Sequence, residues 1–83
     1  MNTAFLLMAE FGTSQIPLAD IAEKYLKMNQ TTAERKANAG ELPIPTYRLN
    51  DSQKSPRIIH VNDLANYIDK QRNDAVIEFN RTR

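Results

Sequence analysis

The stretch QTTAERKANAGELPIPTYRLNDSQKSPRIIHV, residues 30–61, decides the fold of this chain. It begins with a short basic segment that ends at Gly40, and glycine readily takes the left-handed conformation in which helices terminate. Two short segments rich in β-forming side chains follow at residues 46–49 and 57–61, with a polar turn at residues 50–56 between them. This order predicts a helix followed by a β-hairpin wing, an arrangement that can hold a DNA duplex at two places.

The basic segment has the marks of an exposed helix. Thr31 and Glu34 have the S/T-x-x-E spacing of a capping box, which predicts a helix from Thr31 to about Ala39. Its only apolar side chains are alanines, so it should lie on the preceding helix through them and expose Thr32, Arg35, Lys36 and Asn38. Such a thin helix fits a major groove about 12 Å wide. A solvated surface helix is the alternative interpretation.

Two helices should precede this segment. The first is predicted at residues 3–11, with Asn2 or Thr3 as its cap and Gly12 as its end. The second starts with Pro17 in its first turn. Its apolar stripe has the spacing i, i+3, i+4, i+7 and i+8, and consists of Leu18, Ile21, Ala22, Tyr25 and Leu26. We expect Met1, Phe5, Met8 and Phe11 in the core rather than in a binding site.

A last helix should follow the second strand, with Asn62 or Asp63 as its cap. Its core face would be formed by Leu64, Ala65, Tyr67 and Ile68. Residues 73–83 are a tail or a continuation of this helix. If they are helical, Ile68, Ala75 and Phe79 form one stripe that either folds back over the core or makes a dimer contact. The predicted fold is therefore mainly α with a small β-hairpin wing: a single winged helix-turn-helix domain of three to four helices over residues 1–83.

Composition argues for binding rather than catalysis. The 83 residues include no cysteine and one histidine, so disulfides, thiolate metal sites, catalytic triads and histidine clusters are excluded. The chain has no Gly-rich phosphate loop and no apolar run long enough to span a membrane. We interpret the histidine, His60, as a structural or surface residue. The sequence predicts a cytoplasmic protein that is not an enzyme and needs no cofactor or metal.

Positive charge gathers in the middle of the chain. The net charge is only +1, but residues 24–57 hold seven Lys or Arg against three Asp or Glu, a local +4. Residues 1–23 hold three acidic side chains and no Lys or Arg. The basic region is thus the same one that the helix-and-wing pattern assigns to DNA.

Three blocks of sequence resemble the pyocin activator protein (PrtN) family, a group of small prophage-linked DNA-binding regulators of bacteria. They are MNTAFLLMAEFG at residues 1–12, IPLADIAEKYL at 16–26 and SQKSPRIIHVNDLANYIDKQR at 52–72. Residues 31–61 also resemble the wider excisionase and MerR-type winged helix-turn-helix group. That group usually has an aromatic or large apolar residue in its recognition helix, where this chain has Lys36 and Ala37. The resemblance implies a prophage-encoded activator of phage- or pyocin-like genes.

Base and phosphate contacts are predicted on the helix and the wing. Arg35 can donate two bonds to guanine, and the amides of Gln30 and Asn38 can read adenine. Because Gln30 precedes the predicted helix, a phosphate contact is its alternative role. Thr31, Thr32 and Lys36 suit phosphate contacts. In the wing, backbone or minor-groove contacts are expected from Ser52, Gln53, Lys54, Ser55 and Arg57.

The expected partner is double-stranded DNA of the bacterial nucleoid, with RNA polymerase and a second copy of the chain as further candidates, and no membrane. Two other functions remain open. One is an excisionase-like architectural protein that bends DNA. The other is a protein-interaction module, such as an antirepressor, that would use the acidic first third and the apolar tail.

Overall fold

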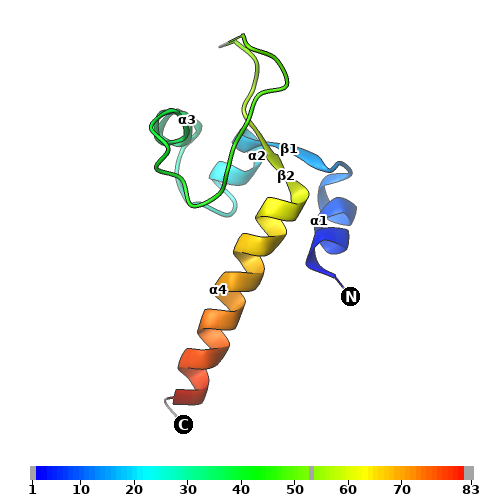
Figure 1. Cartoon of the computed structure of the whole chain (residues 1–83), viewed down its shortest axis with the longest axis vertical. Coiled ribbons are helices and arrows are strands. Elements are labelled where there is room, and N and C mark those ends of the chain that lie inside the picture. The colour runs from blue at the N-terminus through cyan, green and yellow to red at the C-terminus, as the bar shows by residue number, and fades with distance from the viewer. Residues whose placement is uncertain (1, 53, 82–83) are drawn as a thin grey trace.

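The computed structural model describes residues 2–52 and 54–81. In chain order it contains α1 (Thr3–Phe11), β1 (Gln15–Pro17), α2 (Leu18–Ala22), α3 (Gln30–Asn38), β2 (Ile58–His60) and α4 (Val61–Arg81). The first three helices and the strands gather around one end of α4, which projects away from them (Figure 1). The chain is therefore mainly helical with an antiparallel strand pair and a wing loop, which confirms the predicted fold class.

Helix α1 forms as predicted. The Asn2 side chain accepts a hydrogen bond from the Phe5 N–H at 3.0 Å, and Gly12 ends the helix with φ 73°. Leu7 is buried against the core, and Ala4 and Phe11 pack beside it on the same face. The expectation that Phe5 and Met8 are core residues is wrong, because both project from the other faces of α1 and are 63% and 45% exposed. Met1 lies outside the described residues.

A surface cluster fastens α1 to the turn after α2. The Glu10 carboxylate accepts hydrogen bonds from Lys24 Nζ at 2.7 Å and from the Tyr25 hydroxyl at 2.6 Å. The ammonium also lies 5.5 Å from the centroid of the Phe11 ring. The bond from Lys24, and then that from Tyr25, holds the pKa of Glu10 below its ordinary value. The same bond raises the pKa of Lys24.

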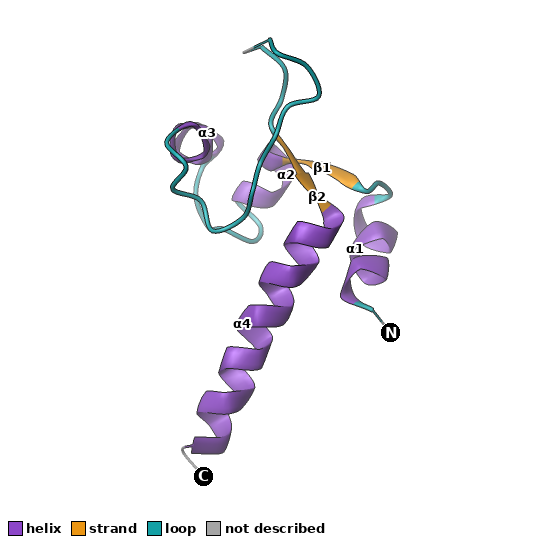
Figure 2. Cartoon of the chain, viewed as in Figure 1, coloured by secondary structure: helices purple, strands orange, loops and turns teal. Residues whose placement is uncertain are grey.

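The strand pairing differs from the predicted hairpin. β1 pairs with β2 in an antiparallel register that places Ile16 opposite Ile59, and both side chains are completely buried. Residues 46–49 form no strand, and Tyr47 makes only one isolated bridge, to Ile58. Their backbones exchange two hydrogen bonds of 3.0 and 2.8 Å. The wing is therefore a long loop, as Figure 2 shows, with one backbone bridge at its base, between Tyr47 and Ile58.

Two prolines explain why the ladder stops at this pair. In an antiparallel pair, hydrogen-bonded positions recur every second residue, so the next pairs beyond Tyr47 and Ile58 would be 45 with 60 and 49 with 56. Pro45 and Pro56 occupy one position in each pair and have no N–H to donate. Since β1 supplies the missing ladder on the other edge of β2, Ile58 and Ile59 still form a buried strand.

The second helix is shorter than predicted. Pro17 ends β1 instead of entering a helix, and α2 closes at Ala22 rather than near Leu26. The chain continues as a turn, with the Tyr25 N–H bonded to the Ile21 carbonyl at 2.8 Å. Lys27 then takes φ 56°, which no regular helix allows, and redirects the chain toward α3. The predicted stripe nevertheless packs on the core, since Leu18, Ile21 and Ala22 are buried and Tyr25 and Leu26 lie against them.

Helix α4 begins directly after β2, so the predicted caps Asn62 and Asp63 are wrong. His60 takes that role: its Nδ1 accepts the Asn62 N–H at 3.0 Å. Val61, Leu64 and Ala65 are buried, and Tyr67 and Ile68 pack partly against the core, as expected. From residue 69 to 81 the helix is exposed on all sides, so the alternative in which the tail folds back over the core is wrong.

Candidate nucleic-acid interface

Helix α3 is fixed at both ends by local hydrogen bonds. Its cap is Asn29, whose side chain accepts the Thr32 N–H at 2.8 Å, so the predicted capping box at Thr31 and Glu34 is wrong. The helix begins one residue earlier than expected and includes Gln30. At its other end, Gly40 has φ 71° and donates to the Ala37 carbonyl at 3.2 Å. The Glu41 N–H bonds to Lys36 at 2.8 Å, which completes a Schellman motif.

Small side chains seat α3 against α2. Ala33 is completely buried, and Ala37 packs partly against the core. The face opposite Ala33 is open: Thr31, Arg35 and Asn38 are exposed, while Thr32 and Lys36 are half-buried. The alanines let α3 lie close to α2, as predicted. The predicted exposure is confirmed for Arg35 and Asn38, whereas Thr32 and Lys36 are half-buried because they flank the buried face. Gln30 is exposed at the first position of the helix.

The wing is ordered by bonds within its own turn. Asn50 Oδ1 accepts the Ser52 N–H at 2.9 Å and also the Ser55 hydroxyl. Ser52 Oγ in turn accepts the Lys54 N–H at 3.1 Å. The Lys54 side chain is exposed near the tip. The two serines that were predicted to contact DNA therefore also shape the turn, and Gln53 lies outside the described residues.

Two arginines join the wing to α3. Arg57 donates to Asn38 Oδ1 through Nη2 at 2.7 Å and Nε at 3.2 Å, and to Thr46 Oγ1 through Nη1 at 3.0 Å. Arg48 donates to the Ser55 carbonyl at 3.0 Å, and its Nη2 lies 3.9 Å from Glu34 Oε2.

Glu34 and Asn38 are four residues apart on α3, so both face the wing from the same side of the helix. Sequence reasoning missed Arg48, Glu34 and Thr46. The register of the wing is the feature that could have identified Arg48, because pairing Tyr47 with Ile58 places Arg48 opposite Arg57.

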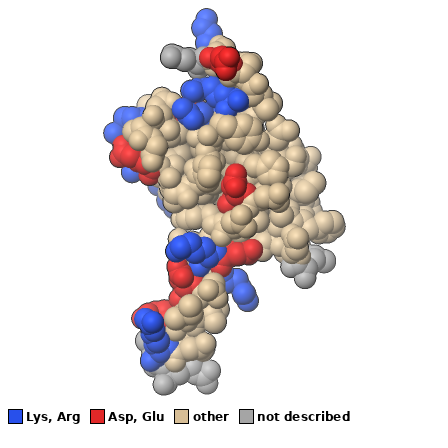
Figure 3. Space-filling view, viewed as in Figure 1, with Lys and Arg blue, Asp and Glu red and all other residues tan. Residues whose placement is uncertain are grey.

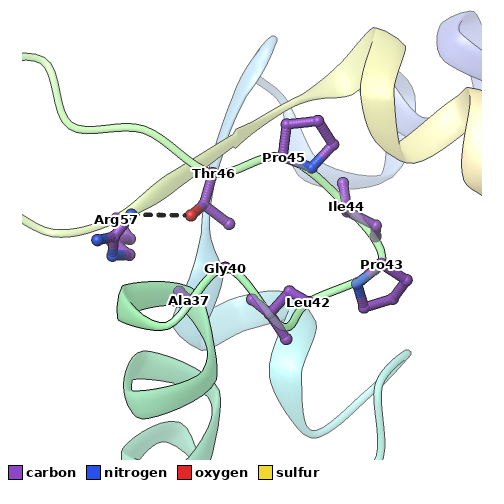
Figure 4. A pocket seen from close by; sticks show the side chains of 8 residues that line it. All are labelled: Ala37, Gly40, Leu42, Pro43, Ile44, Pro45, Thr46 and Arg57. Atoms are coloured by element: carbon purple, nitrogen blue, oxygen red, sulfur yellow. Dashed lines mark hydrogen bonds between the residues drawn. The ribbon is translucent and has the colours of Figure 1, made fainter.

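A hollow of about 340 Å³ lies between the end of α3 and the Leu42–Thr46 segment. Figure 4 shows that segment curving around it, with the Arg57–Thr46 bond at its edge. Its walls are mixed: Ala37, Leu42, Ile44 and the prolines supply apolar side chains, and Thr46 and Arg57 supply polar ones. The two polar side chains at this wall, Thr46 and Arg57, bond to each other and hold its shape.

Charge on the surface agrees with an anionic partner. Figure 3 shows Lys and Arg side chains over α3 and the wing, on the upper left of the view, with Asp and Glu side chains beside them. Arg35 and Lys54 are exposed members of this group. Among the described residues, no cluster of three or more His, Asp and Glu side chains could hold a metal ion. None of the helices in residues 2–52 and 54–81 is long and apolar enough to cross a bilayer.

Comparison with known proteins gives one family. The family model described as pyocin activator protein PrtN matches residues 3–75, which include every element of the fold up to the projecting end of α4. No curated protein and no solved structure matches the chain.

Proposed function

We propose that this chain, which belongs to the pyocin activator protein PrtN family, is a prophage-encoded transcription activator that binds specific DNA sequences through α3 and the wing. The observation that carries the proposal is the pair of arginine bridges between α3 and the wing. They hold an exposed polar helix face and an exposed cationic loop in one fixed relation. Contacting a DNA duplex at two points requires a fixed spacing between α3 and the wing. Solubility alone does not require it.

In this proposal α3 enters the major groove. Arg35 is exposed in its middle and donates two bonds to a guanine. Gln30 and Thr31 stand at the helix N-terminus, where backbone N–H groups and the helix dipole favour a phosphate. Lys36 contacts the backbone as a point charge. The outward direction of Thr31 and Arg35 follows from burial of Ala33 on the opposite face.

The wing reaches the phosphate backbone or the minor groove with Lys54. Ser52 and Ser55 present their hydroxyls there, although each is already engaged in the turn. Arg57 and Asn38 act first as positioning residues, since their polar atoms bond to each other. The protein works by binding, without catalysis, on the bacterial chromosome.

Fragmented bacterial DNA, incubated with the purified protein and excess nonspecific competitor, tests the proposal. Sequencing of the retained fragments should give one short motif upstream of phage-like genes. A motif beside an integrase gene and an attachment site would instead indicate an excisionase-like architectural protein. Absence of any enriched motif would overturn DNA recognition and favour a protein-binding role, such as that of an antirepressor.

A control variant makes the assay specific. Arg35→Ala should enrich a motif that has lost its preference at one base pair, whereas Arg81→Ala, on the projecting end of α4, should enrich the complete motif. If both variants enrich the same motif equally, α3 does not read bases.

A further inference from the structure

The projecting end of α4 has two different edges. Lys70, Asp74 and Arg81 follow one another at intervals of four and seven on one edge, and Lys70 and Asp74 form an ion pair of 2.8 Å. The other edge continues the core face of the helix. At intervals of three and four it carries Ala65, Ile68, Arg72, Ala75 and Phe79, with Val76 beside them. Figure 3 shows the charged side chains of this projection mostly on one side and an uncharged surface on the other.

The stripe of Ala65, Ile68, Arg72, Ala75, Val76 and Phe79 is covered at its start and open at its end. Ala65 is 5% exposed under the core, whereas Val76 and Phe79 are 43% and 59% exposed. Helix α1 covers the flank of α4 only as far as Asp69, whose Oδ1 accepts the Thr3 hydroxyl at 2.5 Å. Residues 70–81 are all exposed and make a helix of about three turns, and helices of this length are marginal in water by themselves.

We infer that the open part of this stripe is a dimer interface, and that a second copy of α4 packs on it antiparallel. This inference rests on the proposed function: a second copy of the chain would give the activator two DNA-binding surfaces. An antiparallel pair about a twofold axis is isologous, so each copy covers the other and no open edge is left.

Charge complementarity selects a second copy as the occupant. Residues 69–81 hold three Lys or Arg and three Asp or Glu, so two copies meet without net repulsion. Arg72 lies inside the apolar stripe and makes no ion pair within the described part of the chain. An antiparallel pair centred between Arg72 and Ala75 sets Ile68 opposite the partner's Phe79. It also brings Arg72 within about one turn of the partner's Glu78, 5.4 Å along the axis.

The contact also has sufficient length. Residues 65–79 span about 20 Å of helix at 1.5 Å per residue. Ala75 at the centre lets the two backbones approach closely, and Ile68, Val76 and Phe79 from both copies fill the seam. Such a seam buries on the order of 500–800 Å² per copy, at or a little below the standard interface of about 800 Å² per partner. The dimer is therefore expected at micromolar concentrations.

Sedimentation of the full chain without DNA is the test, which keeps it independent of DNA recognition. The expected mass is that of two chains at micromolar concentration. Val76→Asp should reduce it to one chain, whereas Ile77→Asp should leave the dimer intact. The two side chains are adjacent and equally exposed, at 43% and 44%, but Ile77 lies on the back of the helix. A wild-type chain that remains monomeric at high micromolar concentration would overturn the inference, as would a dimer that survives Val76→Asp.

Both aspartate variants could be monomeric simply because aspartate weakens the helix. Reversing the charges of Arg72 and Glu78 provides a second test that does not depend on this. Arg72→Glu alone and Glu78→Arg alone should each weaken the dimer by roughly ten-fold or more, and the double reversal should restore it. If the double variant is no tighter than the single ones, α4 does not pair with itself in this register. Loss of DNA binding with the dimer intact would count against the proposed function and leave this inference standing.

Discussion

Arg57 and Asn38 bind each other across the junction between α3 and the wing, with guanidinium nitrogens 2.7 and 3.2 Å from the amide oxygen. Both are residue types that contact DNA in many complexes, and the sequence predicts that role for both. Because the two side chains bind each other, we expect them to position the DNA-contacting residues rather than to contact DNA first. Because Arg57 also donates to Thr46, a single side chain fixes three segments of the chain.

Arg57→Ala should loosen the wing and weaken DNA binding. Loss of hydrogen bonds from a charged group costs about 1.5–3 kcal/mol, part of which should appear as a lower free energy of unfolding. Asn38→Ala should have a similar effect, and the double variant should cost clearly less than the sum of the two single variants, because they remove the same bond. Urea unfolding and DNA titration of the wild type, the two single variants and the double variant complete this double-mutant cycle. Strict additivity would show that the bond contributes nothing to either property.

Arg35→Ala and Lys54→Ala should have different effects on DNA binding. Loss of Arg35 should cost about 1–3 kcal/mol of binding and relax preference at one base pair. Loss of Lys54 should weaken binding to all sequences alike and reduce the slope of log affinity against log salt by about 1. Titration of the enriched site and of single-base variants at several salt concentrations separates the two. If Arg35→Ala weakens all sites equally, its contact is with phosphate.

Stability should fall in acid through Glu10. The bond from Lys24, then that from Tyr25, lowers the pKa of Glu10 in the folded chain below its ordinary value. A carboxyl group with a depressed folded pKa stabilises the fold above its unfolded pKa, and this contribution is lost as the pH falls through the folded pKa. Glu10→Gln should therefore flatten the decline in unfolding free energy between about pH 6 and about pH 3. Glu23→Gln is the control, since Glu23 is exposed and makes no ion pair among the described residues; an equal flattening there would rule out the Glu10 cluster as the cause.

Leu64 should be among the most costly core residues to truncate. It is completely buried where α4 meets the sheet, so Leu64→Ala should lower the unfolding free energy by about 2–5 kcal/mol. Leu49→Ala removes the same atoms from a wing residue that is 68% exposed and should change stability by less than about 0.5 kcal/mol. Chemical denaturation of both variants gives the comparison. Equal losses would mean that Leu49 is buried in solution, for example by a partner.

Local rules were sufficient for part of the fold. The cap at Asn2, the stop at Gly12 and the glycine turn at Gly40 depend on neighbours within five residues, and the sequence predicted all three positions. The packing of α3 through Ala33 and Ala37 followed from the fact that alanines are its only apolar side chains. The outward direction of Arg35 then followed from the period of the helix.

Rules of the same kind failed wherever a distant segment competed. Thr31 and Glu34 fit a capping box, but Asn29 caps the helix and Glu34 faces Arg48, fourteen positions along the chain. Asn62 and Asp63 are good caps, yet β2 runs straight into α4 and leaves the role to His60.

By itself the sequence determined the family, the helix-and-wing order and the polar outer face of α3, because each depends on residue types and short spacings. Only the tertiary structure decided that β2 pairs with β1 rather than with the wing, that Arg57 holds Asn38, and that the end of α4 projects with exposed apolar side chains. The physical reason is that strand pairing, side-chain bridges and helix coverage depend on segments that meet only after folding. The two prolines that stop the wing ladder, Pro45 and Pro56, are plain in the sequence, but their effect depends on a register that the folded chain fixes.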